Sequence, residues 1–184
     1  GEENMRVIVC GCNGAGKSTL GRALGEVLRW PFLDIEDYYF PAENRQAGYA
    51  YGRPRTREEA AALLAADLGR YEDCVLASVR ANYGPAVETA FDAGILLETP
   101  REERLRRVRA RSFRKFGSRM LEGGDLYEAE EAFFRMVAGR RETEPEEWLR
   151  GLRIPVLRLS GEDPVTENVR AAAEWLRAFP AKEE

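Results

Sequence analysis

The chain has 184 residues, of which 44% are hydrophobic and 33% charged, with a net charge of −4 and no histidine. This length suits one α/β domain, and the acidic balance argues against nucleic-acid binding. The lack of histidine excludes histidine bases, His-containing triads and histidine metal ligands, so carboxylates, Lys, Tyr or Ser must carry proton transfer. No apolar run is long enough to span a membrane. Three cysteines without metal or redox spacing predict a reducing, cytoplasmic compartment.

A glycine-rich loop lies between the first expected strand, at residues 6–10, and a helix-forming segment. It reads Gly-x-x-x-x-Gly-Lys-Ser from Gly11 to Ser18, which is the Walker A spacing in its expected strand–loop–helix context. The glycines let backbone N–H groups approach an anion, and the helix N-terminus adds positive charge. Lys17 can reach the β- and γ-phosphates, and Ser18 can ligate Mg²⁺. The expected nucleotide contacts in this loop are Gly11, Asn13, Gly14, Ala15, Gly16, Lys17, Ser18 and Thr19.

An acidic run, Asp34-Ile35-Glu36-Asp37, follows a short second strand at residues 32–33. Ligands of open α/β sheets bind beyond the carboxyl ends of the strands, so we expect at least one of these carboxylates in the site. Asp34 is expected to orient Mg²⁺ through water, and either Glu36 or Asp37 to accept a proton. The alternative interpretation is ordinary helix capping and surface charge. The aromatic, arginine-rich residues 38–55 either line a pocket or form a packed surface loop.

Further elements follow in alternation. The helix after the phosphate loop is expected to bury Leu20, Leu24, Val27 and Leu28. A capping box at Thr56 predicts a helix to about residue 71, followed by a strand at 74–79. That strand ends in Ser78 and Arg80, which are expected to contact an acceptor at the ligand edge. A helix from residue 85 to about 93 and a strand at 95–97 come next.

The segment 101–111 is a basic helix in which Arg104, Arg107 and Arg111 share one face. One interpretation is a solvated face paired with nearby glutamates; the other is a phosphate clamp, in which Arg107 and Arg111 contact nucleotide. Residues 112–125 are basic and glycine-containing, as expected of a mobile cover, and Lys115 and Arg119 could reach the transferring phosphate. Helices at 126–141 and 145–149, a strand at 154–159, a loop and a helix at 165–178 complete the chain.

Four stretches together resemble the P-loop kinases of the nucleoside-monophosphate-kinase, shikimate-kinase and gluconate-kinase group. They are Gly11–Ser18, the acidic segment 32–37, the arginine helix 104–111 that enters a lid, and the adenine-facing loop 159–164 with Gly161. The resemblance implies one three-layer α/β P-loop NTPase domain over 1–184, with a five-stranded parallel sheet in the order 2-3-1-4-5 flanked by helices. It also implies Mg-ATP as the donor, an acceptor region at about 35–70 and a lid at about 112–127.

The end of the third strand departs from these families. Ser78-Val79-Arg80 matches neither the Asp-Gly-Phe-Pro-Arg of adenylate kinases nor the glycine triplet of shikimate kinases, so a different acceptor is expected. The chain also resembles bacterial chains designated AAA family ATPases, through the P-loop alone and without a second, arginine-finger domain. An Asn-Lys-x-Asp guanine motif is absent, which disfavours a GTPase.

The leading hypothesis is therefore an ATP-dependent phosphotransferase acting on a hydroxyl or phosphate of a small molecule. Lys17, Asp34, Glu36, Asp37, Arg107 and Arg111 would be catalytic, and Asp37, Ser78, Arg80 and Arg119 would bind the acceptor. The alternative is a nucleotide-dependent switch or interaction module. We expect a monomer or homodimer without nucleic-acid or membrane partners, and the acidic balance disfavours a kinase of nucleic-acid ends.

Overall fold

The computed structural model describes residues 4–40 and 54–180. The strands are β1 (Arg6–Cys10), β2 (Phe32–Asp34), β3 (Cys74–Ala77), β4 (Ala93–Glu98) and β5 (Val156–Ser160). The helices are α1 (Lys17–Leu28), α2 (Ile35–Tyr39), α4 (Arg57–Arg70), α5 (Pro85–Glu88), α6 (Arg101–Phe116), η1 (Gly117–Met120), α7 (Tyr127–Gly139), α8 (Glu144–Leu152) and α9 (Val165–Arg177). Each strand is followed by one or more helices, in keeping with the alternation that the sequence pattern predicts.

All five strands form one parallel sheet in the order β2-β3-β1-β4-β5, which confirms the order that the family resemblance implies. In the centre, Val7 of β1 lies opposite Val75 of β3 and Ala93 of β4. Because every strand runs the same way, the carboxyl ends of the strands meet at one edge. The segments that follow β1, β2 and β4 there carry the phosphate loop, the acidic run and the basic helix.

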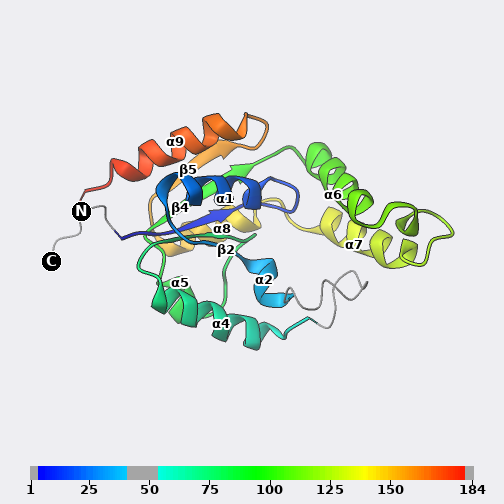
Figure 1. Ribbon diagram of the computed structural model, residues 1–184, viewed down its shortest axis with the longest axis horizontal. Helices are drawn as coiled ribbons and strands as arrows, with labels where there is room; N and C mark the ends of the chain where they lie inside the picture. Colours follow the sequence, from blue (N-terminus) through cyan, green and yellow to red (C-terminus); the bar gives the residue numbers. More distant parts are fainter. Residues whose placement is uncertain (1–3, 41–53, 181–184) are drawn as a thin grey trace.

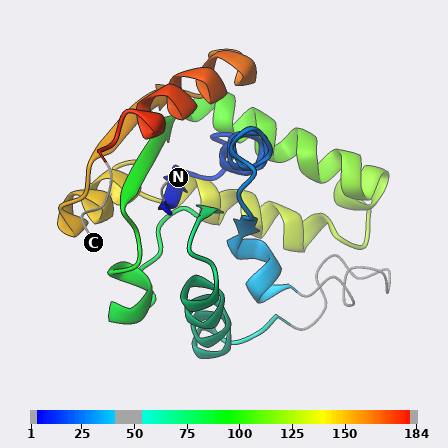
Figure 2. The same ribbon diagram turned by 60° about the vertical axis from the view of Figure 1, so that its left-hand side comes forward.

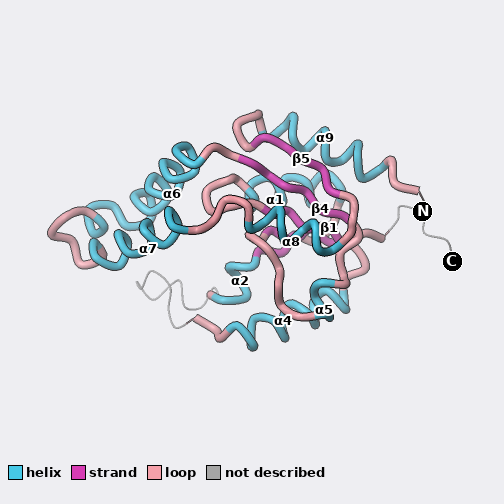
Figure 3. The backbone as a smooth tube through the Cα atoms, turned by 180° about the vertical axis from the view of Figure 1, so that it is seen from behind, coloured by secondary structure: helices cyan, strands magenta, loops and turns pink. Residues whose placement is uncertain are grey.

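Helices cover both faces of the sheet, so the domain has three layers (Figure 1). Helices α1 and α9 pack on one face, and α4, α5 and α8 pack on the other, which Figure 3 shows from behind. Successive residues of β1 point to opposite faces: Val7 and Val9 join the first core, and Ile8 and Cys10 join the second. A strand buried on both faces needs apolar residues at every position, which explains the continuous hydrophobic run of β1.

Helices α6 and α7 form a hairpin that projects from the sheet (Figure 2). Its own small core consists of Val108, Met120, Phe134 and Val137. The helix expected at 101–111 is longer than predicted by more than one turn, because α6 continues to Phe116. The described part of the chain contains no helix that is both long and apolar enough to cross a membrane.

Two sequence-based expectations about helices were wrong. The helix expected from residue 85 to about 93 ends at Glu88, because the Asp92 N–H donates to the Arg6 carbonyl and the chain then enters β4. In α1, Val27 is 49% exposed, whereas Leu20, Leu24 and Leu28 are buried. Positions 20, 24 and 28 form one row along the helix, and Val27 lies beside this row, facing solvent.

Candidate active site

A cavity of about 510 Å³ opens beyond the carboxyl ends of the strands. Its floor is the phosphate loop and the first turn of α1, residues 13–20, and one wall is α6. Residues 161–165, which form the loop after β5 and the first position of α9, line one end, while Glu36 of α2 and Phe133 of α7 also contribute. This location matches the rule that open α/β sheets bind ligands at the carboxyl edge.

The phosphate loop has the backbone that a phosphate-binding nest requires. Gly14 and Gly16 have φ values of 82° and 99°, a region that other residues rarely adopt. A side chain at Gly14 would also collide with the backbone carbonyl of Arg104. Gly16 caps α1 without any side-chain hydrogen bond, so the first N–H groups of α1 are available to an anion.

Lys17 lies within this loop, and its ammonium group donates a hydrogen bond to the Cys12 carbonyl at 3.0 Å. Burial lowers the pKa of Lys17 to about 8, although Cys12, Cys10, Asp34 and Glu36 act in the opposite direction. The ammonium is therefore poorly solvated, and an incoming phosphate oxygen would replace the solvation that it lacks.

Ser18 and Asp34 form the best candidate for an Mg²⁺ site. The Ser18 hydroxyl donates to the Asp34 carboxylate at 2.6 Å, and the other carboxylate oxygen accepts the Glu36 N–H at 3.0 Å. Asp34 thus caps α2, as the alternative interpretation proposed, and also faces the phosphate loop. Hydroxyl and carboxylate oxygens are ligands that Mg²⁺ prefers, so these residues fit the ion. The described residues contain no cluster of three or more histidine, cysteine, aspartate or glutamate side chains that could hold a metal ion.

Arg107 joins the phosphate loop to the loop after β5. Its guanidinium donates to the carbonyls of Gly14, Ala15 and Gly161, at 3.4, 3.3 and 2.9 Å. The Thr99 hydroxyl donates to the same Ala15 carbonyl at 3.1 Å. At Gly161 any side chain would collide with Thr99, so the two loops pack closely. Both Arg107 and Gly161 line the cavity.

Arg111 and Arg104 lie on either side of Arg107 along α6 and reach different walls. Arg111 lines the cavity and pairs with Glu36 at 3.4 Å, which links α6 to α2 above the phosphate loop. Arg104 is only 5% exposed and lies outside this cavity. It donates to the Thr99 carbonyl at 3.0 Å and pairs with Glu142 at 2.8 Å, so it connects α6 to the segment between α7 and α8.

The expected acceptor-binding residues lie away from this cavity. Asp37 is exposed on α2, and its backbone carbonyl accepts a long hydrogen bond from Arg55. The Ser78 hydroxyl donates to the Arg80 carbonyl, and the Arg80 side chain faces Glu144 at 3.6 Å. Arg119 makes a bidentate pair with Asp125 in the hairpin. Within the expected acceptor region, residues 41–53 are outside the described part of the chain.

The remaining expected contacts are distributed around the phosphate loop. Asn13, Ala15, Thr19 and Lys115 line the 510 Å³ cavity, whereas Gly11 lines a smaller cavity of about 130 Å³ with Cys12 and Arg104. The Asn13 side chain also accepts a hydrogen bond from Arg140 at 3.0 Å, which fastens the end of α7 to the loop.

Sequence reasoning missed several lining residues, among them Arg114, Phe133 and Asn168. Arg114 follows Arg111 by three residues, so the same helical spacing that selected Arg107 and Arg111 could have found it. Phe133 lies on α7 and carries no local signal, because only the packing of the hairpin brings it to the cavity. Asn168 donates to the Ser160 carbonyl at 2.8 Å and positions the loop after β5.

Comparisons with known proteins agree with this geometry. The family model described as an AAA domain matches residues 7–125. The uncharacterized protein YqaC of Bacillus subtilis (strain 168) is 30% identical over 183 residues, which cover 95% of this chain and 98% of YqaC.

Solved structures show the same fold at low sequence identity. A protein from Chloroflexus aurantiacus J-10-fl, provisionally described as a kinase, has a TM-score of 0.62 at 18% identity, covering 97% of this chain and 99% of its own. Shikimate kinase from Acinetobacter baumannii has a TM-score of 0.59 at 17% identity, with 94% and 92% covered. A gluconokinase from Sinorhizobium meliloti 1021 has a TM-score of 0.54 at 19% identity, with 94% and 91% covered. The chain therefore has the P-loop kinase fold and belongs to the AAA domain family.

Proposed function

We propose that the protein is an ATP-dependent phosphotransferase that moves the γ-phosphoryl group of Mg-ATP to a hydroxyl or phosphate of a small molecule. The observation that carries the proposal is the continuity of the cavity. It runs from the loop after β5, over the phosphate loop, to a carboxylate at Glu36 and cations on α6. A site that only held a nucleotide would not need a carboxylate and further cations beyond the phosphate loop.

The donor would lie along the floor of the cavity. The N–H groups of the phosphate loop and Lys17 would hold the β- and γ-phosphates, and residues near Gly161 would face the base. Ser18 directly and Asp34 through water would hold Mg²⁺, which neutralises phosphate charge when bound. Arg107 is already committed to three backbone carbonyls, which suits a fixed electrostatic role beside the phosphates.

Glu36 is the better candidate for the base that accepts the proton of the acceptor, because it lines the cavity and Asp37 does not. Its partner Arg111 is held at 3.4 Å with both side chains more than one-third exposed, so the pair is weakened by solvent. A bound γ-phosphate would compete for Arg111, and the Glu36 carboxylate would then be free to accept a proton.

Phosphate transfer from γ-labelled ATP tests the proposal. The purified chain, Mg²⁺ and labelled ATP are mixed with nucleosides, nucleoside monophosphates, sugars and polyols, and Lys17→Ala serves as the blank. We expect label on one acceptor class. Glu36→Gln should lower transfer at least a hundredfold, the scale of general-base catalysis, while Asp37→Asn stays within a few-fold of wild type. Loss of transfer in Asp37→Asn alone would reverse this assignment.

The second candidate is a nucleotide-dependent switch, favoured by the contacts that tie both hairpin helices to the phosphate loop: Arg107 to the Gly14 and Ala15 carbonyls, and Arg140 to Asn13. In that case label would appear only as inorganic phosphate, or nucleotide would bind without turnover.

A further inference from the structure

Two arginines of α6, Arg101 and Arg114, have no carboxylate partner among the described residues. Arg101 instead donates a hydrogen bond to the Ala138 carbonyl of α7. Five others each form an ion pair with a glutamate. The pairs are Arg104–Glu142, Arg106–Glu103, Arg107–Glu103, Arg109–Glu131 and Arg111–Glu36. Arg114 comes next on the helix and has no hydrogen bond or ion pair with any described residue. It nevertheless lines the 510 Å³ cavity. An exposed guanidinium that faces a cavity and is not neutralised by the protein is available to a ligand.

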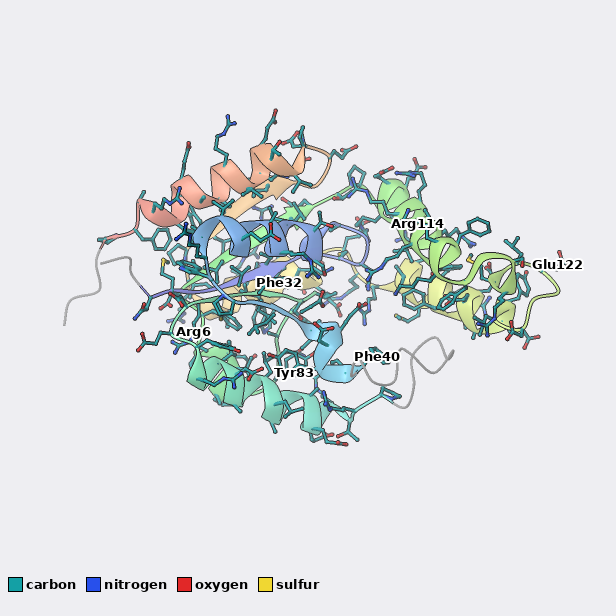
Figure 4. The ribbon with its side chains drawn as sticks, viewed as in Figure 1. Arg6, Phe32, Phe40, Tyr83, Arg114 and Glu122 are labelled. Atoms are coloured by element: carbon teal, nitrogen blue, oxygen red, sulfur yellow. The ribbon has the colours of Figure 1, made fainter. Side chains whose placement is uncertain are left out.

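The position of Arg114 along α6 indicates which part of a ligand it would meet. Arg107 contacts Gly161 at the end of the cavity that would hold the base. Arg111, one turn further, reaches Glu36 of α2 on the opposite side of the phosphate loop. Arg114 is about 4.5 Å further out along the helix axis. Figure 4 places it on the outer part of α6, between the sheet and Glu122 near the tip of the hairpin.

This order places Arg114 past the donor phosphates. A nucleotide that begins at Gly161 and ends at Lys17 would already lie between Arg107 and Arg111. The next group outward would belong to the acceptor. Phe133, from α7, lines the same cavity and is 37% exposed, so the outer end combines a cation with an apolar surface.

We propose that Arg114 binds an anionic group, a phosphate or a carboxylate, on the acceptor, so that the acceptor is a small organic anion. A guanidinium presents two parallel N–H donors that match either group. The inference rests on the proposed transfer function and narrows its substrate class. Arg114 is a specificity-determining residue in this view, and it takes no part in breaking the phosphoryl bond.

Kinetics with matched acceptors test the proposal. The pairs differ in one charged group: ribose and ribose 5-phosphate, uridine and uridine 5′-monophosphate, glucitol and gluconate. For a charged acceptor, Arg114→Ala should raise KM about tenfold, the scale of one hydrogen bond to a charged group. The KM for ATP should not change, kcat should stay within about twofold, and Arg114→Lys should recover part of the loss. Arg135→Ala is the matched control, because Arg135 is exposed on the same hairpin and does not line the cavity.

Three kinetic results would overturn the inference. These are an unchanged KM for the charged acceptor in Arg114→Ala, an equal rise for its uncharged counterpart, or a rise in the KM for ATP. The last would mean that Arg114 contacts the donor.

If wild type transfers phosphate to none of these acceptors, the proposed function fails for this panel, and a binding measurement still decides the inference. Inorganic phosphate is titrated by calorimetry into protein saturated with Mg²⁺ and the non-hydrolysable analogue AMP-PNP. Arg114→Ala should weaken phosphate binding about tenfold relative to wild type and Arg135→Ala. Equal affinities in all three proteins, or no phosphate binding to wild type, would overturn it.

Discussion

The protonation of Lys17 should make nucleotide affinity depend on pH. Its ammonium group donates to the Cys12 carbonyl, and its burial lowers the pKa of Lys17 from 10.5 to about 8. The neutral form is thus favoured in the free protein above about pH 8. A bound triphosphate favours the charged form, because opposite charge at short range raises the pKa of a lysine.

We therefore expect ATP affinity to fall as the pH rises above about 8. Below this pH, Lys17 is already charged and binding takes up no proton there. Between pH 8 and 10, binding must restore a proton, and the dissociation constant should rise up to about tenfold for each pH unit. Titrations from pH 6.5 to 9.5 check this. Lys17→Arg should give a flat profile, because arginine stays charged throughout. A flat profile in wild type would contradict the expectation.

At the scale of elements, the start of α6 is held by contacts to two other segments of the chain. Arg104 is buried there and connects α6 to the Thr99 carbonyl and to Glu142. Arg106 is exposed, and within the described part of the chain it pairs with Glu103 of its own helix alone. The two arginines are close in sequence and have very different surroundings.

Their alanine variants should therefore differ in stability. Arg104→Ala removes a buried guanidinium and leaves a carbonyl without its donor, which should lower the free energy of unfolding by about 2–3 kcal/mol. Arg106→Ala removes an exposed pair and should change it by less than about 0.5 kcal/mol. Urea unfolding of both variants measures the difference. Similar losses in the two would show that Arg104 does not hold α6 in place.

At the scale of the whole molecule, the cavity is lined by segments that follow β1, β2, β4 and β5. A ligand that binds there stabilises the folded state as a unit, because the unfolded chain has no such site.

Mg-ATP at a hundred times its dissociation constant should stabilise the protein by about 2.7 kcal/mol. For a domain of this size that corresponds to a rise in Tm of about 5–10 °C. Differential scanning fluorimetry with Mg²⁺ and AMP-PNP avoids turnover. Lys17→Ala should show a much smaller shift at the same nucleotide concentration. A shift of equal size in that variant would place the nucleotide elsewhere.

Much of this architecture follows from local sequence pattern. The apolar run of β1, the glycine spacing after it and the capping box at Thr56, which forms as predicted, need no knowledge of distant contacts. The sheet order came from family resemblance and is confirmed. These features are local or depend on general rules of parallel sheets.

The contacts that individual side chains make were harder to predict. Arg104, Arg107 and Arg111 share one helical face, yet they reach Glu142, Gly161 and Glu36. Spacing defines the face, and only the packing of α6 against three other segments decides what each residue meets. Glu36 and Asp37 differ by about 100° around α2, so the orientation of that short helix alone brings Glu36 to the cavity.

The hairpin of α6 and α7 is attached to the rest of the domain at its inner end. Its inner ends are anchored beside the phosphate loop, α6 through Arg104 and α7 through the hydrogen bond from Arg140 to Asn13. The outer half is held together by the small core around Met120 and Phe134 and by two contacts between the helices, the Arg109–Glu131 ion pair and the hydrogen bond from Ser112 to Glu130. Arg114 lies in this half and Arg107 in the anchored half. The donor side of the cavity is thus covered by the anchored half of α6, and the acceptor side by the outer half, which is farther from these anchoring contacts.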